Sequence, residues 1–392
     1  MTTHALTVNA GSSSLKFALF ALDGLSCRAT GLVDRIGGDA TLELSDDTGA
    51  VLAQRDLGGR GADHAEALRA AIDAVREAFA DAEVAVVGHR IVHGGTDHDR
   101  PVRLDDDVIA GLKALEPFAP LHQPHNLAGV RGARAAFPEA VQVACFDTAF
   151  HRRHPFVNDV FGLPREYYEK GVRRYGFHGL SYEFIASELA RTAPDLHAGR
   201  VAVAHLGNGA SMCGIVGGRS VASTMGFTAL DGLPMGTRCG QLDPGVVLYL
   251  MEEEGLDAAA ISDMLYRRSG LLGLSGISND MRALEASEDP RADEAIAYFT
   301  FRIRRELGGL AAAMEGLDAV VFTGGIGENS DRIRREVCAP MGWLGIDLDE
   351  GANAAHDRVV SAGDARVTVM VIPTNEERVI ARAAADAIKG GG

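Results

Sequence analysis

The sequence has few cysteines and lacks any paired cysteine motif. Its five cysteines, Cys27, Cys145, Cys213, Cys239 and Cys338, are widely separated and never spaced as Cys-x-x-Cys. This pattern excludes a disulfide framework and a cysteine zinc cluster, and it predicts reduced thiols in the cytoplasm. Histidine pairs with the helical spacing and the neighbouring carboxylate of a zinc-peptidase motif are also missing, so a histidine-ligated metal is not expected.

Long hydrophobic runs and excess positive charge are missing as well. No apolar run is long enough to span a bilayer, and the first residues have no basic segment followed by an apolar stretch, so we expect neither a membrane helix nor a signal peptide. Lys and Arg number 38 against 54 Asp and Glu, a formal net charge of −16. Such an acidic surface argues against nucleic acid or an anionic membrane as the main partner. Anionic ligands would need a local concentration of Arg, Lys and backbone N–H groups.

What is present is enough apolar material for two domains. The chain has 392 residues, of which 46% are hydrophobic and 23% are charged, which is the balance of a two-domain globular protein. Apolar periodicity predicts strands at 6–8, 15–19, 84–87, 141–145, 201–205, 212–216, 220–224, 318–323 and 367–372. It predicts helices at 63–80, 105–115, 126–136, 290–316 and 376–389. Residues 151–180 show no sustained period, and we expect an irregular functional or interdomain segment there.

Two hairpins of similar design lie about half a chain apart. TVNAGSSSLKFALF surrounds residue 10, and AHLGNGASMCGIV surrounds residue 208. Each contains an apolar strand, a turn made of Asn, Gly, Ala and Ser, and a second apolar strand. The repetition predicts a duplicated α/β domain with a phosphate-binding turn in each half.

The turns have the composition of phosphate cradles, although ordinary hairpin turns share it. Glycine permits close backbone approach, serine and backbone N–H groups donate, and Lys16 adds charge; Asn-Gly, however, is also the strongest short hairpin signal. The spacing GxxxxGK[ST] of a P-loop is absent. A third turn, FTGGIGENS at 322–330, follows a buried strand and opens a helix. It suits a nucleotide, or it is a plain helix entry.

Two arginines stand between glycines where anions are commonly bound. Arg90 follows a predicted strand in GHRIVHGG, and Arg238 lies in MGTRCG, a loop that leaves the guanidinium accessible. Most arginines only solubilise a surface, but guanidinium groups held in this way bind carboxylates and phosphates well. These two are the candidate anion-binding residues.

Taken in order, the motifs resemble the acetate kinase family of the actin/Hsp70/sugar-kinase superfamily. The resemblance runs nearly end to end through NAGSSSLK, GHRIVHGG, FDTAFH, RYGFHGLSY, HLGNGAS, MGTRCGQLDP, FTGGIGENS and PTNEE. It implies an α/β fold with two duplicated ribonuclease-H-like, actin-like ATPase domains and an interdomain cleft. Residues 1–150 with 377–392 would form the N-terminal domain, completed by the C-terminal helix, and 151–376 the nucleotide-binding domain.

The resemblance also implies a role for each residue that matches a family motif. The implied catalytic residues are Asp147, Arg90, His178 and Arg238. The residues implied to organise the metal are Asn9, Asp147 and Glu376. The implied substrate-binding residues, which include an apolar pocket for the acyl methyl group, are Arg90, Val92, Leu121 and Phe177. The implied ATP-binding residues are Ser12, Ser14, Lys16, His205, Gly207, Asn208, Gly324, Gly325, Ile326 and Asn329.

The implied activity is reversible in-line transfer of the ATP γ-phosphoryl group to acetate, giving acetyl phosphate and ADP. The implied cofactor is Mg²⁺, with Mn²⁺ as an alternative, and the implied assembly is a cytoplasmic homodimer acting in acetyl-CoA biosynthesis. A carboxylate is already ionised at pH 7 because its pKa lies at about 4–5, so direct transfer needs no general base.

Alternatives remain at this stage. Propionate or butyrate kinase is one, because one methylene in an apolar pocket discriminates by only about 1–3 kcal/mol; a non-metabolic actin-fold ATPase is another. The sequence departs from the family at Ala229, where proline is common, and at Cys239 and Gln241, where serine and aspartate are common. We expect a slightly larger acyl pocket and a changed polarity beside Arg238.

Overall fold

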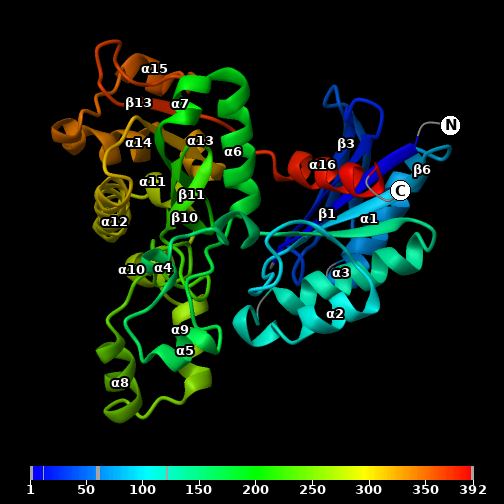
Figure 1. The fold of residues 1–392 in the computed structure, drawn as a ribbon, viewed down its shortest axis with the longest axis horizontal. Helices are drawn as coiled ribbons and strands as arrows, with labels where there is room; N and C mark the ends of the chain where they lie inside the picture. The colour runs from blue at the N-terminus through cyan, green and yellow to red at the C-terminus, as the bar shows by residue number, and fades with distance from the viewer. Residues whose placement is uncertain (1–2, 12, 59–61, 121, 390–392) are drawn as a thin grey trace. The chain divides into compact units, whose positions relative to one another are not determined.

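The computed structural model describes residues 3–11, 13–58, 62–120 and 122–389, which form two compact units (Figure 1). The first unit comprises residues 1–152 and 375–392, and the second comprises 153–374. The sequence expectation placed these junctions at 150/151 and 376/377. Glu376 therefore belongs to the first unit, in which the red C-terminal helix of Figure 1 rejoins the blue strands.

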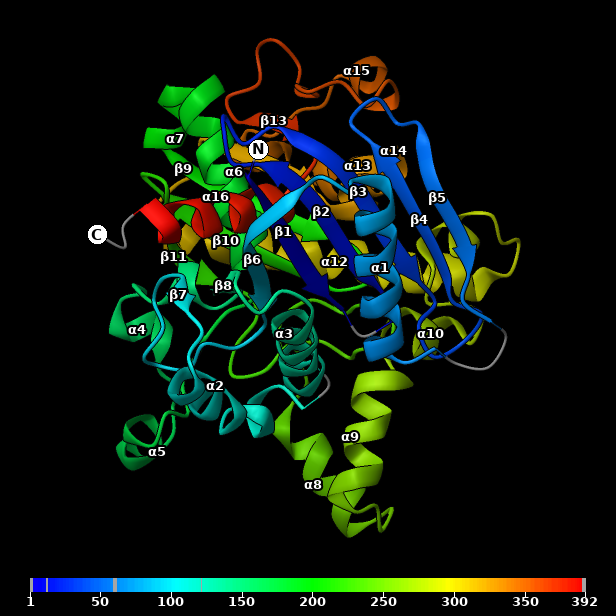
Figure 2. The same ribbon diagram turned by 90° about the vertical axis from the view of Figure 1, so that its right-hand side faces the viewer.

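An eight-stranded sheet in the order β5-β4-β3-β2-β1-β6-β8-β7 forms the first unit (Figure 2). Its strands are β1 (Thr3–Ala10), β2 (Leu15–Ala21), β3 (Cys27–Asp34), β4 (Thr41–Asp46), β5 (Val51–Asp56), β6 (Glu83–Ile91), β7 (Val102–Arg103) and β8 (Val141–Phe146). Strands β1 to β5 pair antiparallel in chain order, whereas the pairs β1–β6 and β6–β8 are parallel. The carboxyl ends of these three strands therefore meet at one edge of the sheet.

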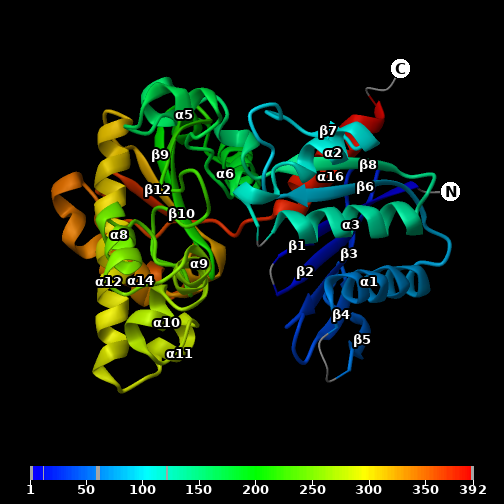
Figure 3. The ribbon, with the colours of Figure 1, turned by 90° about the horizontal axis from the view of Figure 1, so that it is seen from below.

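Helices cover both faces of this sheet. They are α1 (His64–Ala78), α2 (Asp106–Lys113), α3 (Gln123–Ala136) and α16 (Glu376–Lys389). Figure 3 shows α1 and α3 on one face and α16 on the other. Helix α16 approaches the strands closely because β6 has a glycine beneath it: a Cβ on Gly88 would lie 2.5 Å from Ile380 Cγ2.

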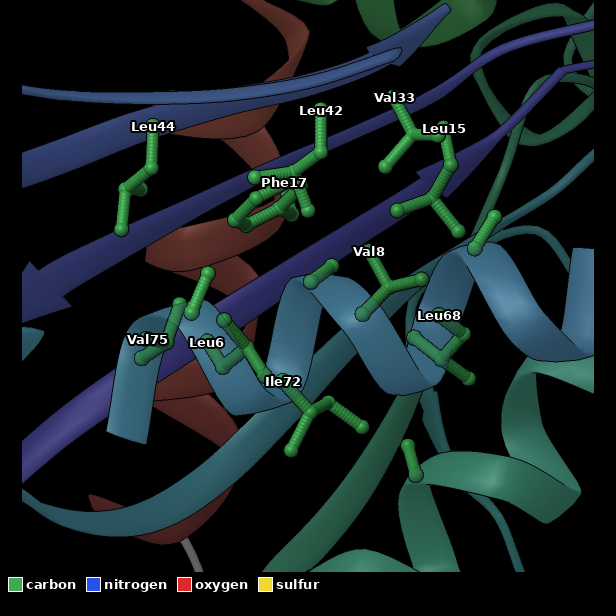
Figure 4. Packing of buried hydrophobic residues seen from close by; sticks show 14 of the residues in the cluster. Leu6, Val8, Leu15, Phe17, Val33, Leu42, Leu44, Leu68, Ile72 and Val75 are labelled. Atoms are coloured by element: carbon green, nitrogen blue, oxygen red, sulfur yellow. The ribbon is translucent and has the colours of Figure 1, made fainter. Parts of the chain in front are cut away.

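One hydrophobic core of the first unit lies between the sheet and α1. Alternate side chains of the strands point toward this helix, which presents Leu68, Ile72 and Val75 (Figure 4). The strand residues labelled in that view are Leu6, Val8, Leu15, Phe17, Val33, Leu42 and Leu44. Asp63 starts α1 with a capping box, since its side chain accepts from Glu66 N while Glu66 Oε2 accepts from Asp63 N. Burial of each aliphatic side chain of this core stabilises the folded state by about 1.5–3 kcal/mol relative to leaving it exposed to water.

A five-stranded sheet in the order β11-β10-β9-β12-β13 forms the second unit. Its strands are β9 (Arg200–Leu206), β10 (Ala210–Val216), β11 (Arg219–Ser223), β12 (Ala319–Thr323) and β13 (Thr368–Val371). The long α12 (Pro290–Ala313) lies on one face and α6 (Gly179–Thr192) on the other (Figures 1 and 3). The remaining helices are α4 (Phe156–Asp159), α5 (Arg165–Glu169), α7 (Pro194–Ala198), α8 (Pro244–Glu252), α9 (Ala258–Arg267), α10 (Gly270–Ser275), α11 (Met281–Glu285), α13 (Gly324–Asn329), α14 (Asp331–Cys338) and α15 (Glu350–Ala354).

The predicted duplication is confirmed by the strand topology. In the first unit β3-β2-β1-β6-β8 has two antiparallel pairs followed by two parallel pairs. In the second unit β11-β10-β9-β12-β13 has the same order and the same directions. The hairpins β1–β2 and β9–β10 occupy equivalent places, so the similar turns found in the sequence are topological equivalents.

The sequence pattern and the structure differ in several elements, short and long. Residues 151–180, expected to be irregular, contain the short helices α4 and α5, whose four or five residues are too few to show a 3.6-residue period. The pattern also missed β3 to β5, β7, the 14-residue helix α6, and the small helices α7 to α11, α14 and α15. Within the described ranges, no helix has the length and apolarity needed to cross a membrane.

Candidate active site

Hydrogen bonds connect five side chains at the carboxyl edge of the first unit's parallel strands. Arg90 donates through Nε to Asp147 Oδ1 at 2.9 Å and through Nη2 to Asp147 Oδ2 at 2.6 Å. Its Nη1 donates to Asn9 Oδ1 at 3.0 Å. The Asn9 amide in turn donates to Glu376 Oε2 at 3.0 Å and to Glu377 Oε1 at 3.2 Å. We call Asn9, Arg90, Asp147, Glu376 and Glu377 the carboxylate cluster.

The fold explains why these residues meet. Asn9 and Arg90 are the second-last residues of β1 and β6, and Asp147 directly follows β8. Parallel strands deliver such residues to one edge, where ligands bind in open α/β sheets. The main-chain N–H of Asp147 also donates to Ile91 O, which ties β8 to β6 at this edge. Helix α16 begins at the same place and adds its two glutamates.

The electrostatics of the carboxylate cluster favour a cation. Asp147 is 1% exposed and the Arg90 side chain 16% exposed. Burial disfavours the Arg90 charge, but Asp147, with Glu376, more than compensates and raises the pKa of the Arg90 guanidinium above its ordinary value. The formal charges of one guanidinium and three carboxylates sum to −2. Carboxylate and amide oxygens are the ligands that Mg²⁺ prefers, so the residues fit such an ion in donor type and charge.

The first hairpin turn lies next to this cluster along the chain. Gly11 N donates to Ser14 O at 2.8 Å, which closes the turn. His64 Nε2 hydrogen-bonds to Gly11 O at 2.8 Å. Lys16 is exposed and stands opposite Asn9 in the β1–β2 register. Of the predicted phosphate-binding residues here, Ser14 and Lys16 are described, whereas Ser12 lies outside the described residues.

The predicted acyl-pocket residues are buried where the structure describes them. Val92, in the first unit, is 3% exposed, and its N–H donates to Asn126 Oδ1 at 3.0 Å. Phe177, in the second unit, is 2% exposed. Leu121 lies outside the described residues. Val92 and Phe177 are thus buried apolar residues, each within its own unit.

In the second unit, the start of α6 is attached to both strands of the β9–β10 hairpin. His205 and Ser211 face each other in the antiparallel register, just before and after the turn 207–209. Ser181 Oγ and His205 Nδ1 are 2.9 Å apart, and His178 Nδ1 and Ser211 Oγ are 2.8 Å apart. The rings of His178 and His205 stack with centroids 4.3 Å apart. The first turn of α6 therefore holds the base of the predicted phosphate turn.

His178 and Arg238 border one point on that turn. A Cβ placed on Gly209 would lie 3.3 Å from His178 Nε2 and 3.8 Å from Arg238 Nη2. Arg238 Nη1 donates to the carbonyl oxygen of Ala229 at 3.0 Å, which holds the guanidinium in position. The missing side chain at Gly209 leaves space beside two nitrogen atoms that can donate to an anion.

The third predicted turn, which opens α13, lies beside the second. Gly324 has φ 77°, and a Cβ there would be 2.8 Å from Leu206 O, so only glycine fits. The ideal Cβ position of Gly207 is 3.8 Å from Gly325 N. Asn329 Nδ2 donates to Gly325 O at 2.9 Å. Gly325 and Asn329 are exposed and Ile326 is half-buried, so the turn presents a surface to solvent.

Several residues of this site were missed by the sequence reasoning. Glu328 Oε1 accepts from Gly324 N at 2.7 Å and from Thr374 N at 3.1 Å, which holds the α13 turn. Glu328 lies inside the quoted motif FTGGIGENS, so the motif itself pointed to it. No sequence motif pointed to Asn279. The ideal Cβ position of Gly236 is 2.3 Å from Oδ1 of Asn208, a predicted phosphate-binding residue, and 3.1 Å from the carbonyl oxygen of Asn279.

Two departures from the family pattern have structural explanations. Gln241 Oε1 accepts from Nη2 of Arg302 and from Nη2 of Arg305, each at 2.6 Å, so this side chain anchors α12. Cys239 N donates to Leu265 O at 3.2 Å. Burial raises the pKa of the Cys239 thiol, which keeps it protonated. The residues that follow Arg238 therefore support its loop.

Acetate kinases and a propionate kinase are similar to this chain over nearly its whole length. Residues 4–382 match the model of the acetokinase family. An acetate kinase of Methylocella silvestris is 57% identical over 392 residues, covering 97% of each chain. The structure of a propionate kinase from Francisella tularensis superposes with a TM-score of 0.90 at 34% identity, covering 98% of this chain and 99% of that one. An acetate kinase structure from Porphyromonas gingivalis gives 0.87 at 36% identity, covering 98% and 100%.

Proposed function

The chain belongs to the acetokinase family, and from this membership we infer that it is a phosphotransferase with a carboxyl group as acceptor. We propose that its substrates are ATP and acetate and its products ADP and acetyl phosphate, in a reversible reaction. The observation that carries the proposal is the pair of nitrogens at the second hairpin turn, His178 Nε2 and Arg238 Nη2, around the point left open by Gly209.

The chemistry requires charge stabilisation more than proton transfer. Acetate is ionised at neutral pH and attacks the γ-phosphorus without a base. The difficulty is the repulsion between the two anions and the charge spread over the equatorial phosphoryl oxygens. In this proposal Arg238 and His178 donate to those oxygens, and Arg90 orients the acceptor and the phosphoryl group. Fixed donors in a site that excludes water lower the barrier most.

The carboxylate cluster is the proposed metal site. Asn9, Asp147 and Glu376 would hold Mg²⁺, with Mn²⁺ as an alternative, and the ion would supply charge neutralisation at the nucleotide phosphates. No three His, Cys, Asp or Glu side chains in the described part of the chain form a metal cage by themselves. Mg²⁺ commonly takes one or two carboxylates and completes its shell with water and phosphate. Asp147 would have a second task, because both of its oxygens also hold Arg90.

Nucleotide binding is proposed for the glycine turns. Ser14 and Lys16 in the first unit, together with Ser12, would contact phosphates. In the second unit the phosphate-binding residues would be His205, Gly207 and Asn208, and the adenosine-binding residues Gly324, Gly325, Ile326 and Asn329. The two adjacent turns of the second unit support this proposal.

Acetate is preferred to longer acids in this proposal, and propionate is the second candidate. Val92 and Phe177 would face the methyl group, together with Leu121. The similar propionate kinase structure favours keeping propionate as an alternative, since one methylene changes binding by only about 1–3 kcal/mol. The half-buried Ala229 would relax the preference slightly.

The test is ATP-dependent acyl phosphate formation, trapped as the hydroxamate with hydroxylamine. With Mg²⁺ and ATP we expect the highest kcat/KM for acetate, a lower value for propionate and the lowest for butyrate. A higher value for propionate would reassign the substrate. ATP hydrolysis without any hydroxamate from the three acids would refute the kinase proposal and favour a non-metabolic actin-fold ATPase.

Assembly and location are also proposals. Helix α8 exposes Val246, Leu248, Tyr249 and Met251, by 40%, 56%, 53% and 49%. An apolar helix face of this kind supports a homodimer in which two copies cover it. The five free cysteines support a reducing cytoplasm, where acetyl phosphate could supply acetyl-CoA synthesis.

A further inference from the structure

We propose that Ser211 and Tyr182 are positioning residues that hold His178 as its neutral Nε2–H tautomer, with this N–H directed at the phosphate turn beside Arg238. The inference rests on the proposed function for its catalytic meaning, but the tautomer itself is a property of the folded chain. Ser211 and Tyr182 would act through His178 and not on the substrate itself.

The geometry places Ser211 between two ring-bearing side chains. Ser211 Oγ is 2.8 Å from His178 Nδ1 and also hydrogen-bonds to the Tyr182 hydroxyl. Ser211 and Tyr182 are both fully buried. His178 and Tyr182 lie four residues apart at the start of α6, and Ser211 lies on β10. The three groups therefore join the helix to the strand that carries the turn.

The order of donors follows from the chemistry of the two hydroxyls. A phenol is a stronger donor and a weaker acceptor than an aliphatic alcohol, because its lone pair is shared with the ring. Burial raises the pKa of Tyr182 well above its ordinary value, so the phenol keeps its proton. Tyr182 then donates to Ser211 Oγ, and the single Ser211 proton is donated to His178 Nδ1. A neutral imidazole that accepts at Nδ1 carries its proton on Nε2.

The backbone and the neighbouring ring fix the direction of that N–H. His178 caps α6 in the left-handed conformation, with φ 58° and ψ 24°. A non-glycine residue is strained in this conformation, and such strain is characteristic of functional sites. Stacking on His205 then fixes the ring plane. With Nδ1 bound to Ser211, Nε2 is the nitrogen 3.3 Å from the open point at Gly209.

The consequence is a donor that needs no added proton. A neutral Nε2–H can donate to a phosphoryl oxygen at any pH at which the ring is neutral, whereas the other tautomer would present a lone pair to the anion. Outer hydrogen-bond partners of functional histidines orient the ring in this way in metal sites, and their loss costs about 10- to 100-fold. Ser211 and Tyr182 would do the same here for a phosphoryl-binding histidine.

The direct test is the tautomer of His178 in the full-length protein. Long-range ¹H–¹⁵N correlation spectra of histidine-labelled enzyme, assigned with His178→Gln, should show Nε2 protonated and Nδ1 unprotonated. In Ser211→Ala and Tyr182→Phe the signals should move toward a tautomer mixture. Thr300→Ala is the matched control, since it removes another buried hydroxyl of the second unit, and it should leave the His178 signals unchanged.

Kinetics give the second readout. Ser211→Ala and Tyr182→Phe should each lower kcat by about 10- to 100-fold while KM for ATP changes by less than about threefold. Ser211→Thr, which keeps the hydroxyl, should recover most of kcat. In a His178→Ala background, adding Ser211→Ala should have little further effect, because the residues act as one unit.

The two proposals fail in different ways. An inactive wild type whose His178 is still the Nε2–H tautomer would refute the kinase assignment and leave this inference standing. An active wild type with Nδ1 protonated, or a tautomer unmoved by both Ser211→Ala and Tyr182→Phe, would overturn the inference. Tyr182→Phe removes one oxygen only, so it decides the matter even if Ser211→Ala does not fold.

Discussion

At the residue scale, charge is arranged by pairing one group against another. Arg90 and Asp147 form a buried bidentate pair, and Asn9 relays hydrogen bonds from Arg90 to the glutamates of α16. Breaking a buried pair by removing one partner costs about 3–5 kcal/mol, because the other charge remains buried. Such residues therefore have both structural and chemical effects, and their variants need matched controls.

Arg238→Ala tests the proposed transition-state contact. An arginine that contacts the transferring phosphoryl group is worth about 10³–10⁵ in kcat, so we expect a loss of at least about 10³ with an unchanged circular dichroism spectrum. Steady-state hydroxamate assays measure it. Arg191→Ala, which removes an exposed arginine of α6, should keep wild-type turnover. Near-normal kcat in Arg238→Ala would remove this residue from the mechanism.

Asp147→Asn tests the proposed metal site. The change lowers the negative charge of the carboxylate cluster, so the Mg²⁺ concentration for half-maximal rate should rise by about 10- to 100-fold. Initial rates over a magnesium titration measure this. Asp318→Asn is the control, because Asp318 forms a similar bidentate pair with Arg200 outside the proposed site. An unchanged magnesium requirement in Asp147→Asn would argue that Asp147 only orients Arg90.

At the scale of elements, α16 connects packing to the site. Its buried face lies against β1, β6 and β8, and its first residues, Glu376 and Glu377, bind Asn9. The close approach depends on the missing side chain at Gly88, whose ideal Cβ position is 2.5 Å from Ile380. A shift of this helix would therefore move two carboxylates of the cluster.

Gly88→Ala should displace α16. The added methyl group overpacks the contact with Ile380, and we expect a loss of about 1–3 kcal/mol in the free energy of unfolding, measured with urea. We also expect a higher magnesium requirement, because Glu376 moves with the helix. The control is Gly111→Ala in α2, where an added Cβ would have no neighbour within 4 Å. Its free energy of unfolding should rise by about 0.4–1 kcal/mol. Equal stability of the two variants would contradict the packing argument.

Strand β6 contains a buried histidine, bonded to β8, that makes stability depend on pH. His89 Nε2 donates to Gln142 Oε1 at 2.8 Å, and burial lowers the pKa of His89 to about 4. The unfolded state takes up a proton near pH 6.5 while the folded state does not. Stability from this residue is therefore complete above pH 6.5 and falls as the pH drops from 6.5 to about 4, by about 3 kcal/mol. In urea unfolding, the free energy of unfolding of His89→Gln should therefore fall less than that of the wild type between pH 6.5 and pH 4. An equal fall in both proteins would contradict this role of His89.

At the scale of the whole molecule, one topology occurs twice in an acidic chain. Each unit carries a hairpin turn at the end of its first parallel strand, with cationic side chains nearby: Lys16 and Arg90 in one unit, Arg238 in the other. The net charge of −16 repels anionic substrates, so these local groups must overcome the general field. Helix α8 in the second unit exposes four large apolar side chains.

The double variant Leu248→Glu/Met251→Glu tests the proposed dimer. These residues lie three apart on α8 and are about half exposed, so two charges should prevent burial of this face between copies. Light scattering after size exclusion should give the wild type twice the chain mass of 41.3 kDa and the variant one chain mass. Val51→Glu, at an exposed position of β5, should remain dimeric. A monomeric wild type would refute the proposal.

The sequence by itself determined the fold class, the duplicated hairpins and the family, because these depend on local periodicity and on motifs in a set order. It also pointed to Arg90, Arg238 and the glycine turns. Only the tertiary structure decided which side chains meet: Asp147 with Arg90, Ser211 with His178, Glu328 with Thr374. These pairs join residues far apart in the chain or on different elements, and no local pattern encodes such contacts. Short helices such as α4 and α5 escaped prediction for a related reason, since tertiary packing rather than periodicity stabilises them.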